Sequence, residues 1–575
     1  MGNCLSEKSN EAFSKENNLL ESDGNFIEMY PQRAYSNWSH QIKSMPYITF
    51  VPYTKTGICN IVKWARKSHL QVRACGYRHT FSELHPDSVN HIVISMLPLK
   101  NVETLPSEEI EIDPRNELMG IEILRETHSG KKALVKIGAS VTNSQFRIWA
   151  VANTRAGKKS FTVPINTIMI ENTFAGTISL CCHGSGRNHQ TLSDLVREIE
   201  FVNVNGEIQT VNDPEEIKAA AGCFGLLGIV TSLTLELDEM TYANFAPHAE
   251  SLGMAIPPFP DPKLLHLPEK LYDEIFGEIS EEQLATATKE FYHKCDDHYY
   301  AEWFWFVFTD KCFVNVWNND GSREKITYEY PSILETKLEE ITSFVSQEIS
   351  PIMGILPHNI ETILTGNFGF DSIVQGTAQA STPLINALHF RRGIQNARVK
   401  NTEVIIPIPE KNGKPDWSIC QRAWWDAIVA IYEYKNKYNR YPVNIALEMR
   451  LLGDSNMFLA PERANAFGSI SIEVVTFAYT EETEWREFTQ YLTDKWSSYK
   501  DHNGKPINVR PHWAKQWDHL NINNMSMSDY YRDQYKKDLD EFKNQMEKIA
   551  ASSNYKFSDL QLFSNSTLDK LIFAA

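Results

Sequence analysis

The sequence predicts an α+β protein made of two successive units. Three observations support this prediction. Apolar residues recur at helical spacing in some segments and alternate in others. An Asn205-Gly206 turn joins two apolar runs, and a proline-rich stretch at 243–270 separates an ordinary first unit from an aromatic-rich second one. The 575 residues are 42% hydrophobic and 22% charged, a composition that allows large cores and excludes a disordered or coiled-coil chain.

The first unit alternates helices and strands. Apolar residues from Ile58 to Ala65 recur at helical spacing and predict a helix, which a short strand at 70–75 follows. Residues 199–211 form a hairpin, because Asn-Gly supplies the positive φ angles of a two-residue turn. A helix begins after Asp213, a capping residue that Pro214 follows. The remaining elements predicted here are strands at 134–137 and 229–237 and a helix at 142–152.

The second unit is richer in aromatic residues. The segment from Trp303 to Trp317 is apolar on both sides of a Thr309-Asp310-Lys311 turn and predicts a hairpin that is buried on both faces. The other elements predicted here are an amphipathic helix at 421–437, strands at 443–451 and 469–477, and a polar helix at 528–551.

Charge and cysteine content exclude several classes of protein. The chain has 56 Lys and Arg against 73 Asp and Glu, a net charge of −17, which argues against a nucleic-acid binder. The nine cysteines are an odd number without a CxxC pair, so we expect neither a disulfide framework nor a structural zinc site. No HExxH or other metal-ligand motif occurs, and the prediction for metals is none.

The N-terminus has no apolar core of a secretory signal, and no run reaches the ~18 apolar residues of a membrane span. Gly2 and Ser6 fit the N-myristoylation pattern, and Cys4 is placed for palmitoylation. Two interpretations stay open: residues 1–34 are a disordered tail that carries acyl chains, or a plain acidic tail. We expect a cytoplasmic protein, anchored on the cytoplasmic face of a membrane if acylated, and not a secreted one.

Three glycine-bearing turns in the first unit are the main candidates for a binding site. They lie at 75–82, 174–186 and 222–229. No phosphate-binding G-x-x-x-x-G-K-[ST] loop occurs, and Gly184-Ser185-Gly186 lacks the third glycine of a dinucleotide fingerprint. The residues alone leave two alternatives: the turns converge on a phosphate-bearing cofactor, or they are ordinary loops.

In order and spacing, these turns resemble the FAD-binding domain of the vanillyl-alcohol oxidase flavoprotein superfamily. The motifs are GYRHTFS, TFAGTISLCCHGSG and AAGCFGLLGIVTSLTLEL, followed in the second half by LEMR and VRPHWAK. The last pair resembles both the class II cholesterol oxidases, which carry covalent FAD, and the aldonolactone and alditol oxidases. Cys181-Cys182 depart from the Gly-Thr that the superfamily usually has there.

The resemblance implies a domain plan. A PCMH-type FAD-binding domain with two subdomains would span 35–242, after the tail at 1–34. An α+β cap with an antiparallel sheet would span 243–500 and bind the substrate. A C-terminal segment at 501–575 would complete the flavin site.

The resemblance also implies the cofactor contacts. FAD would be linked covalently through a ring nitrogen of His79, and Lys515 would stabilise the reduced flavin. The other implied contacts are Gly76, Tyr77, Arg78, Thr80, Phe81, Ala175, Gly176, Cys182, His183, Gly184, Ser185, Gly228 and Ile229.

The catalytic candidates come from strand alternation. Glu448 and Arg450 are two residues apart and share one face of their strand, while Leu447 and Met449 take the other. By themselves they form either a structural ion pair or an active site. The resemblance implies that Glu448 is the catalytic base and that Arg450 binds the substrate oxygen or the reduced flavin. Glu302 is a further substrate-binding candidate.

The implied activity is the oxidation of an alcohol to a carbonyl by FAD, with O2 reduced to hydrogen peroxide. The partners would be a small-molecule alcohol and O2, with a sterol-like or other hydrophobic alcohol as the substrate. An aldonolactone or alditol oxidase is the alternative, and a membrane-tethered flavoprotein scaffold or sensor without catalysis is the alternative of another class.

Overall fold

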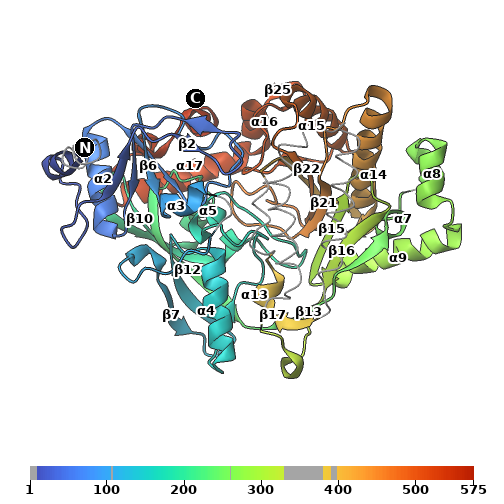
Figure 1. The fold of residues 1–575 in the computed structure, drawn as a ribbon, viewed down its shortest axis with the longest axis horizontal. Helices are drawn as coiled ribbons and strands as arrows, with labels where there is room; N and C mark the ends of the chain where they lie inside the picture. The colour runs from blue at the N-terminus through green and yellow to red at the C-terminus, as the bar shows by residue number, and fades with distance from the viewer. Residues whose placement is uncertain (1–9, 105–107, 260, 329–379, 390–397, 575) are drawn as a thin grey trace.

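The computed structural model describes residues 10–104, 108–259, 261–328, 380–389 and 398–574. Two units lie side by side, the N-terminal unit on the left of Figure 1 and the aromatic-rich unit on the right. The termini of the described chain both lie on the N-terminal unit. The structure is a mixture of helices and mainly antiparallel sheets, as the sequence predicts.

The N-terminal unit contains a four-stranded sheet with the order β1-β4-β6-β5. Strands β4 (Ile48–Val51), β6 (His91–Ser95) and β5 (Gln71–Cys75) are parallel. Helix α2 (Lys55–Lys67) connects β4 to β5 and buries Ile58, Ile61 and Val62, which confirms the helix expected from their spacing. The strand expected at 70–75 is β5.

The first strand corrects the expectation of a disordered tail up to residue 34. Residues Glu28–Pro31 form β1, which pairs antiparallel with β4. The carboxylate of Glu21 accepts hydrogen bonds from the backbone N–H groups of Tyr53 and Thr54, at 3.0 and 3.1 Å. Leu19 and Ile27 are buried. These few apolar anchors are scattered among charged residues, so the composition of the segment conceals them.

The second sheet of this unit has the order β11-β10-β12-β8-β7, and β9 (Phe161–Thr162) pairs with β12. Its strands are β7 (Ile121–Glu126), β8 (Lys132–Gly138), β10 (Val196–Val202), β11 (Ile208–Val211) and β12 (Ile229–Glu239). The predicted hairpin is β10-β11. The predicted capped helix is α6 (Pro214–Ala220), where the Asp213 carboxylate accepts from the N–H groups of Glu215 and Glu216. Helices α4 (Asn143–Arg155) and α5 (Phe174–Ser179) complete the unit.

The second unit is built on a seven-stranded antiparallel sheet with the order β14-β16-β15-β21-β22-β18-β23. The predicted aromatic hairpin is β15 (Tyr300–Phe306) and β16 (Lys311–Trp317). The strand expected at 469–477 is β22 (Ser469–Phe477), and the one expected at 443–451 is β21 (Ala446–Leu452). The other strands are β14 (His248–Ser251), β18 (Val399–Pro407) and β23 (Arg510–Pro511).

Helices cover one face of this sheet. They are α9 (Glu281–Asp297), α14 (Ser418–Glu433) and α15 (Glu482–Ser497). Trp303, Trp305 and Met449 from the sheet share a core cluster with Trp424 and Trp485 of these helices. The opposite face of the sheet remains available for polar side chains.

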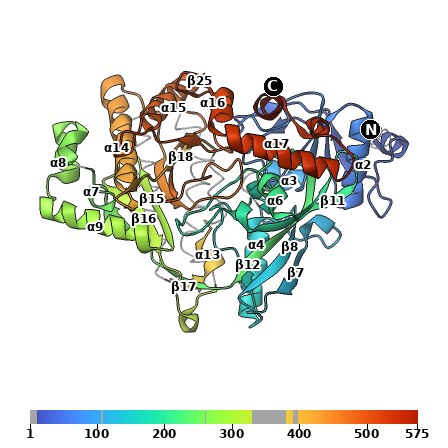
Figure 2. The same ribbon diagram turned by 180° about the vertical axis from the view of Figure 1, so that it is seen from behind.

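The C-terminal segment returns to the N-terminal unit. Its polar helix is interrupted at Tyr535, which gives α16 (Met527–Gln534) and α17 (Lys536–Ala551) instead of one helix. Helix α17 packs against α6 and runs across the back of the N-terminal unit in Figure 2. Phe542 and Met546 of α17 belong to the core cluster of that unit. The aromatic-rich unit is therefore inserted between two parts of one core.

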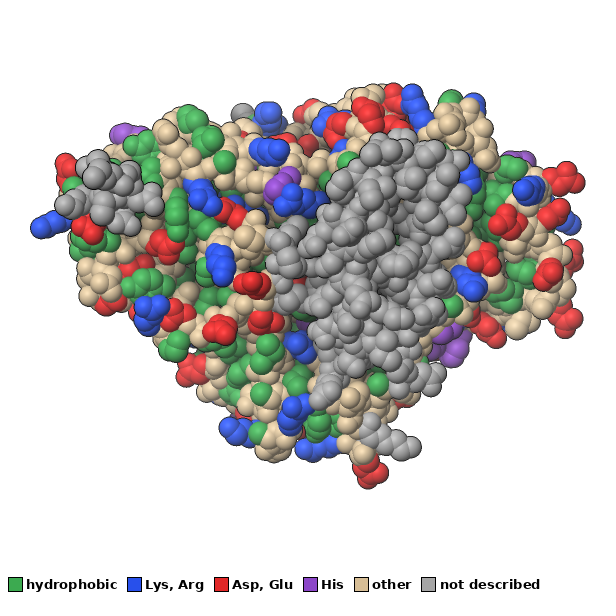
Figure 3. All heavy atoms as spheres, viewed as in Figure 1, with side chains coloured by type: hydrophobic (Ala, Val, Ile, Leu, Met, Phe, Trp, Pro, Cys, Tyr) green, Lys and Arg blue, Asp and Glu red, His purple; other side chains and the backbone are tan. Residues whose placement is uncertain are grey.

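Charged side chains of both signs are interspersed over the described part of the face in Figure 3. Among the described residues, no helix is long and apolar enough to cross a membrane.

Candidate functional site

The polar face of the seven-stranded sheet gathers acidic side chains by strand register. Glu448 of β21 lies opposite Phe304 of β15 and Glu473 of β22, and Glu473 lies opposite Glu403 of β18. One step along, Arg450 lies between Glu302 of β15 and Ser471 of β22. Because side chains alternate along each strand, all of these residues share one face.

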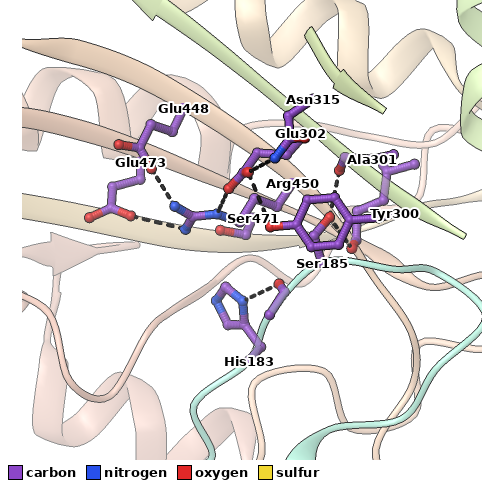
Figure 4. A network of polar contacts seen from close by, with 12 residues as sticks. His183, Ser185, Tyr300, Ala301, Glu302, Asn315, Glu448, Arg450, Ser471 and Glu473 are labelled. Carbon is purple, nitrogen blue, oxygen red and sulfur yellow. Dashed lines mark hydrogen bonds and ion pairs between the residues drawn. The ribbon is translucent and has the colours of Figure 1, made fainter. Parts of the chain in front are cut away.

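Arg450 lies at the centre of this group (Figure 4). Its guanidinium pairs with Glu302 at 2.6 Å, with Glu473 at 3.3 Å, and with Glu448. Burial alone would lower the pKa of Arg450, but the three carboxylates outweigh it and hold the pKa above its usual value. Arg450 therefore keeps its charge and ties β15, β21 and β22 together.

Glu302 is held more tightly than Glu448. Tyr300 Oη donates to Glu302 Oε2 at 3.1 Å, and Asn315 Nδ2 donates to the same atom at 3.0 Å. The Glu302 side chain is fully buried, whereas 13% of the Glu448 side chain is exposed. Of the two carboxylates, Glu448 is the one that an incoming molecule can reach.

Glu448 is also the carboxyl whose proton affinity is suited to catalysis. Burial raises its pKa most, Glu473 and Glu302 raise it further, Arg450 opposes them, and the resulting pKa is about 8. A carboxyl group with a pKa near the working pH can both accept and release a proton.

Lys515 brings a second cation to the group from the C-terminal segment. Its Nζ lies 2.6 Å from Glu473 Oε1 and 3.5 Å from Glu403 Oε2. Burial acts to lower the pKa of Lys515, and the two carboxylates reverse that effect and raise it. Lys515 therefore brings a partly exposed ammonium group to the cluster that contains Glu448 and Arg450.

His183 is the point where the first unit meets this sheet. Its Nε2 lies 2.8 Å from Glu403 Oε1, and its Nδ1 lies 3.0 Å from Gly184 O. Both neighbours are acceptors, so both ring nitrogens carry hydrogen and His183 is an imidazolium. Burial would lower the pKa of His183, but Glu403 outweighs it and raises the pKa.

His512 completes the cluster. Its side chain is buried, and its ring lies edge-to-face on His183 with 5.0 Å between the ring centres. One nitrogen or oxygen from each of His183, Glu403 and His512 lies within 4.8 Å of the others. These are the described residues with the donor set and spacing to hold a metal ion.

The glycine-bearing turns of the first unit pack closely on one another. A Cβ on Gly76 would lie 2.5 Å from Thr173 Oγ1, and one on Gly184 would lie 2.1 Å from Asn166 O. Only glycine allows these approaches. The 75–82 turn carries His79 and is called the histidine loop below. It is bonded to the C-terminal segment, because Phe81 N–H donates to Ala514 O at 2.8 Å and Ser82 Oγ donates to Trp513 O at 2.6 Å.

The residues around these turns fit FAD. Ser140 Oγ, Asn172 Oδ1 and Thr177 Oγ1 are buried and have no hydrogen-bond partner within the described part of the chain. Buried polar atoms normally have partners, so this group indicates a polar ligand. FAD carries a pyrophosphate and a ribityl chain that can supply such partners.

His79 lies beside this region, between two aromatic rings. Its ring stacks on Trp38 at 4.8 Å and on Tyr77 at 5.2 Å between centroids. Thr80 and Phe81 continue the same loop. The stacking fixes the imidazole plane, as a covalent attachment point would require.

Some predicted cofactor contacts have other roles in the fold. The Arg78 guanidinium pairs with Glu103 at 3.4 Å and lies over the Tyr35 ring. Ser185 Oγ donates to Ala301 O at 2.5 Å and thereby docks the turn on the second unit. A Cβ on Gly228 would lie 2.4 Å from Val202 O, so this glycine is needed for strand packing; Ile229 beside it is buried.

The structure explains part of the departure of Cys181-Cys182 from the Gly-Thr that is usual in similar proteins. Cys181 has φ 49°, in the left-handed region that glycine favours. Its side chain is accommodated because Gly222 has none: a Cβ there would lie 2.5 Å from Cys181 Sγ. Burial raises the pKa of the Cys182 thiol to about 12, so the sulfur stays protonated near the turn.

Sequence reasoning missed Glu403, Glu473 and His512. A signal was present for Glu473, which alternates with apolar residues in Ile470-Ser471-Ile472-Glu473-Val474 and shares a strand face with Ser471. Glu403 follows the polar residues Lys400, Asn401 and Thr402, so its segment does not stand out as a buried strand. His512 lies inside the VRPHWAK motif, but the resemblance assigns a role there to Lys515 alone.

Comparison with known proteins identifies the cofactor domain. Residues 46–212 match the family described as FAD binding domain. L-gulono-1,4-lactone dehydrogenase of Mycobacterium tuberculosis is 20% identical over 483 residues, 84% of this chain and 89% of that protein. D-arabinono-1,4-lactone oxidase of Saccharomyces cerevisiae is 33% identical over 88 residues, 15% of this chain and 17% of that protein.

The fold has relatives among solved structures. Cholesterol oxidase from B. sterolicum superposes with a TM-score of 0.65 at 14% identity, over 95% of this chain and 97% of that one. The grass pollen allergen Phl p 4, which has glucose dehydrogenase activity, gives 0.51 at 11% identity over 89% of each chain. Together, these comparisons and the turns that fit the cofactor show an FAD-dependent oxidoreductase: residues 46–212 match the FAD-binding family, and the fold of the chain is similar to that of cholesterol oxidase.

Proposed function

We propose that the protein oxidises an alcohol CH–OH group to a carbonyl and transfers the electrons to O2, with hydrogen peroxide as the second product. The observation that carries this proposal is the position of Glu448, a reachable carboxyl beside Arg450 and Lys515, on the sheet face that meets His183 of the FAD-binding unit. FAD, when bound, supplies the two-electron chemistry, taking up a hydride equivalent from the carbon and passing two electrons on to O2.

In this proposal, residues of the chain accept the proton of the substrate and stabilise the negative charge of the reduced cofactor. Glu448 accepts the proton of the substrate hydroxyl when its carboxylate is ionised. Arg450 donates a hydrogen bond to the substrate oxygen in this proposal. Lys515 and the His183 imidazolium would supply positive charge that stabilises the negatively charged reduced cofactor.

The face around Glu448 supports a hydrophobic alcohol as the substrate. Phe304, Phe306 and Phe313 form a small apolar cluster with Ala446. Phe304 lies directly opposite Glu448 in the strand register, and the Arg450 guanidinium carbon lies 5.9 Å from the centre of its ring. An apolar surface next to the proton acceptor suits a sterol-like or other hydrophobic alcohol.

A second candidate is oxidation of an aldonolactone or alditol. It is favoured by the His512-Trp513-Ala514-Lys515 segment and by the curated relatives named for lactone substrates. The converging polar groups Asn315, Ser471 and Glu473 would suit several substrate hydroxyls.

A parallel substrate screen tests these proposals. Purified holoenzyme is supplied with sterols, aldonolactones or polyols, and H2O2 release is measured beside reduction of an artificial electron acceptor. Preference for sterols supports the proposal, and preference for lactones or polyols supports the alternative. If the substrate reduces the artificial acceptor but no H2O2 is released, O2 is not the oxidant. Failure of every alcohol class with both readouts would favour the flavoprotein scaffold.

We further propose that FAD is attached covalently through His79, and that the protein is cytoplasmic, with Gly2 and Cys4 acylated so that it is held on a membrane. The first proposal is supported by the stacked position of His79. The second is supported by the sequence pattern at Gly2, Cys4 and Ser6; residues 1–9 lie outside the described part of the chain.

A further inference from the structure

The hydrogen bonding of His512 fixes the proton on its ring. The backbone N–H of Ala514 donates to His512 Nδ1 at 3.1 Å. An Nδ1 that accepts a hydrogen bond carries no hydrogen, so the hydrogen of the neutral ring lies on Nε2. The ring is neutral, because an imidazolium would carry hydrogen on Nδ1 as well and could not accept this bond.

The Nε2–H group of His512 is buried and has no hydrogen-bond partner among the residues that the structure describes. Leaving such a donor unpaired costs roughly 1–3 kcal/mol. Other buried donors are also unpartnered among the described residues, such as the indole N–H groups of Trp303 and Trp424 in the aromatic-rich core. What distinguishes His512 is its position beside the turns that fit FAD, where a bound cofactor can supply the missing acceptor.

A metal ion is not the partner that this geometry favours. His183, Glu403 and His512 have a suitable spacing, but a histidine that holds hydrogen on Nε2 has no lone pair there for a metal. His183 Nε2 is occupied as well, by its hydrogen bond to Glu403. The Nε2–H group of His512 is therefore a hydrogen-bond donor with charged neighbours.

The neighbours of His512 belong to the cofactor loops. Its ring faces His183, which lies in the 174–186 turn within the matched FAD-binding region. Its own segment is bonded to the histidine loop through Phe81 and Ser82. The apolar cluster of Phe304, Phe306 and Phe313 is a separate cluster on the other strands of the sheet.

We propose that His512 Nε2–H donates a hydrogen bond to the bound FAD and so stabilises the reduced cofactor. A fixed neutral N–H donor stabilises negative charge and keeps its hydrogen while it does so. The inference requires FAD binding and is independent of the substrate, so a wrong substrate assignment leaves it intact.

Two variants separate this role from a structural one. His512→Asn keeps an acceptor near the place of Nδ1 and removes the donor at Nε2. His512→Gln can reach the place of Nε2 with an N–H group and removes the acceptor that faces Ala514. The measurement is the reduction midpoint potential of the FAD in each purified holoenzyme, with thermal unfolding as the measure of folding.

We expect His512→Asn to lower the ratio of reduced to oxidised FAD about tenfold at a given potential, a shift of about 30 mV for a two-electron couple. His512→Gln should stay within a few-fold of wild type. The reverse pattern, or wild-type potentials in both variants, would overturn the proposal. So would loss of FAD from both folded variants, because the ring and not its N–H would then be required. Stoichiometric Zn²⁺ binding by wild-type holoenzyme that His512→Asn abolishes would establish a metal site in its place.

Discussion

At the scale of single residues, Glu448 combines exposure with an unusual proton affinity. It is the member of the Arg450 group that solvent reaches, and burial with its acidic neighbours raises its pKa to about 8. It must be ionised to accept a proton. The rate of substrate oxidation should therefore increase with pH and level off above about pH 8.

This prediction is checked by measuring kcat/KM from about pH 6 to pH 10. Glu433→Gln, on the outer helix α14, is a matched control that should keep the wild-type profile. A profile without an ionisation near pH 8, or one that falls as pH rises through this range, would remove Glu448 from the role of proton acceptor.

His79 is the second prediction at this scale. An imidazole ring nitrogen can act as a nucleophile, and stacking on Trp38 and Tyr77 holds the His79 ring in place. Acid-precipitated wild-type protein should keep yellow, fluorescent flavin on the polypeptide, and His79→Ala should release it. His69→Ala, on an exposed turn, is the control. Complete release of flavin from the wild type would show that the linkage does not exist.

At the scale of elements, Arg450 joins three strands through Glu302, Glu473 and the partly exposed Glu448. Replacing it by Gln leaves Glu302 and Glu448 without the cation that pairs with them, while Glu473 keeps its pair with Lys515. Removing one partner of a buried pair costs roughly 3–5 kcal/mol. Arg450→Gln should therefore lower the free energy of unfolding by about that amount, measured by denaturant unfolding of the holoenzyme.

The matched control is Arg440→Gln, which breaks an exposed pair with Glu487 at 2.8 Å. Exposed pairs contribute about 0–1 kcal/mol. Equal losses in the two variants would mean that the Arg450 group contributes no more to the sheet than a surface pair.

The elements also show what the sequence can predict. Strand β22 and the β15-β16 hairpin follow from alternation and aromatic runs, which are local signals. The row Glu448–Glu473–Glu403 depends on the register of β21, β22 and β18, and no local pattern specifies that register. Strand β1 was missed for a related reason, because its stability comes from pairing with β4 and not from its own composition.

At the scale of the whole molecule, the site is assembled from segments far apart in the chain. His183 comes from the first unit, and His512 and Lys515 come from the returning C-terminal segment. The inserted unit contributes the four carboxylates of Glu302, Glu403, Glu448 and Glu473. The motifs predicted that these segments belong together. The hydrogen bonds that bring them together, such as His183 to Glu403, required the structure.

Attachment to a membrane is a prediction at this scale. A single myristoyl chain binds membranes only marginally, with a constant on the order of 10⁴ M⁻¹. The acidic tail adds no attraction to anionic lipids, so palmitate on Cys4 would be needed as a second anchor. We expect wild type to fractionate with membranes in its native host, Gly2→Ala to be soluble, and Cys4→Ser to be partly so. Ser9→Ala is the control. Unchanged fractionation of Gly2→Ala would exclude acylation as the anchor.

The most direct test of the central claim is single-turnover reduction of the bound FAD without oxygen. Wild type and Glu448→Gln, loaded with equal FAD, are mixed at about pH 9 with the best alcohol from the screen, and the absorbance of the oxidised flavin is followed. We predict reduction in the wild type and a rate roughly 10²–10⁴-fold lower in Glu448→Gln, the loss typical of a missing general base. Equal rates in the two proteins, or no reduction of the wild type by any alcohol, would contradict the account.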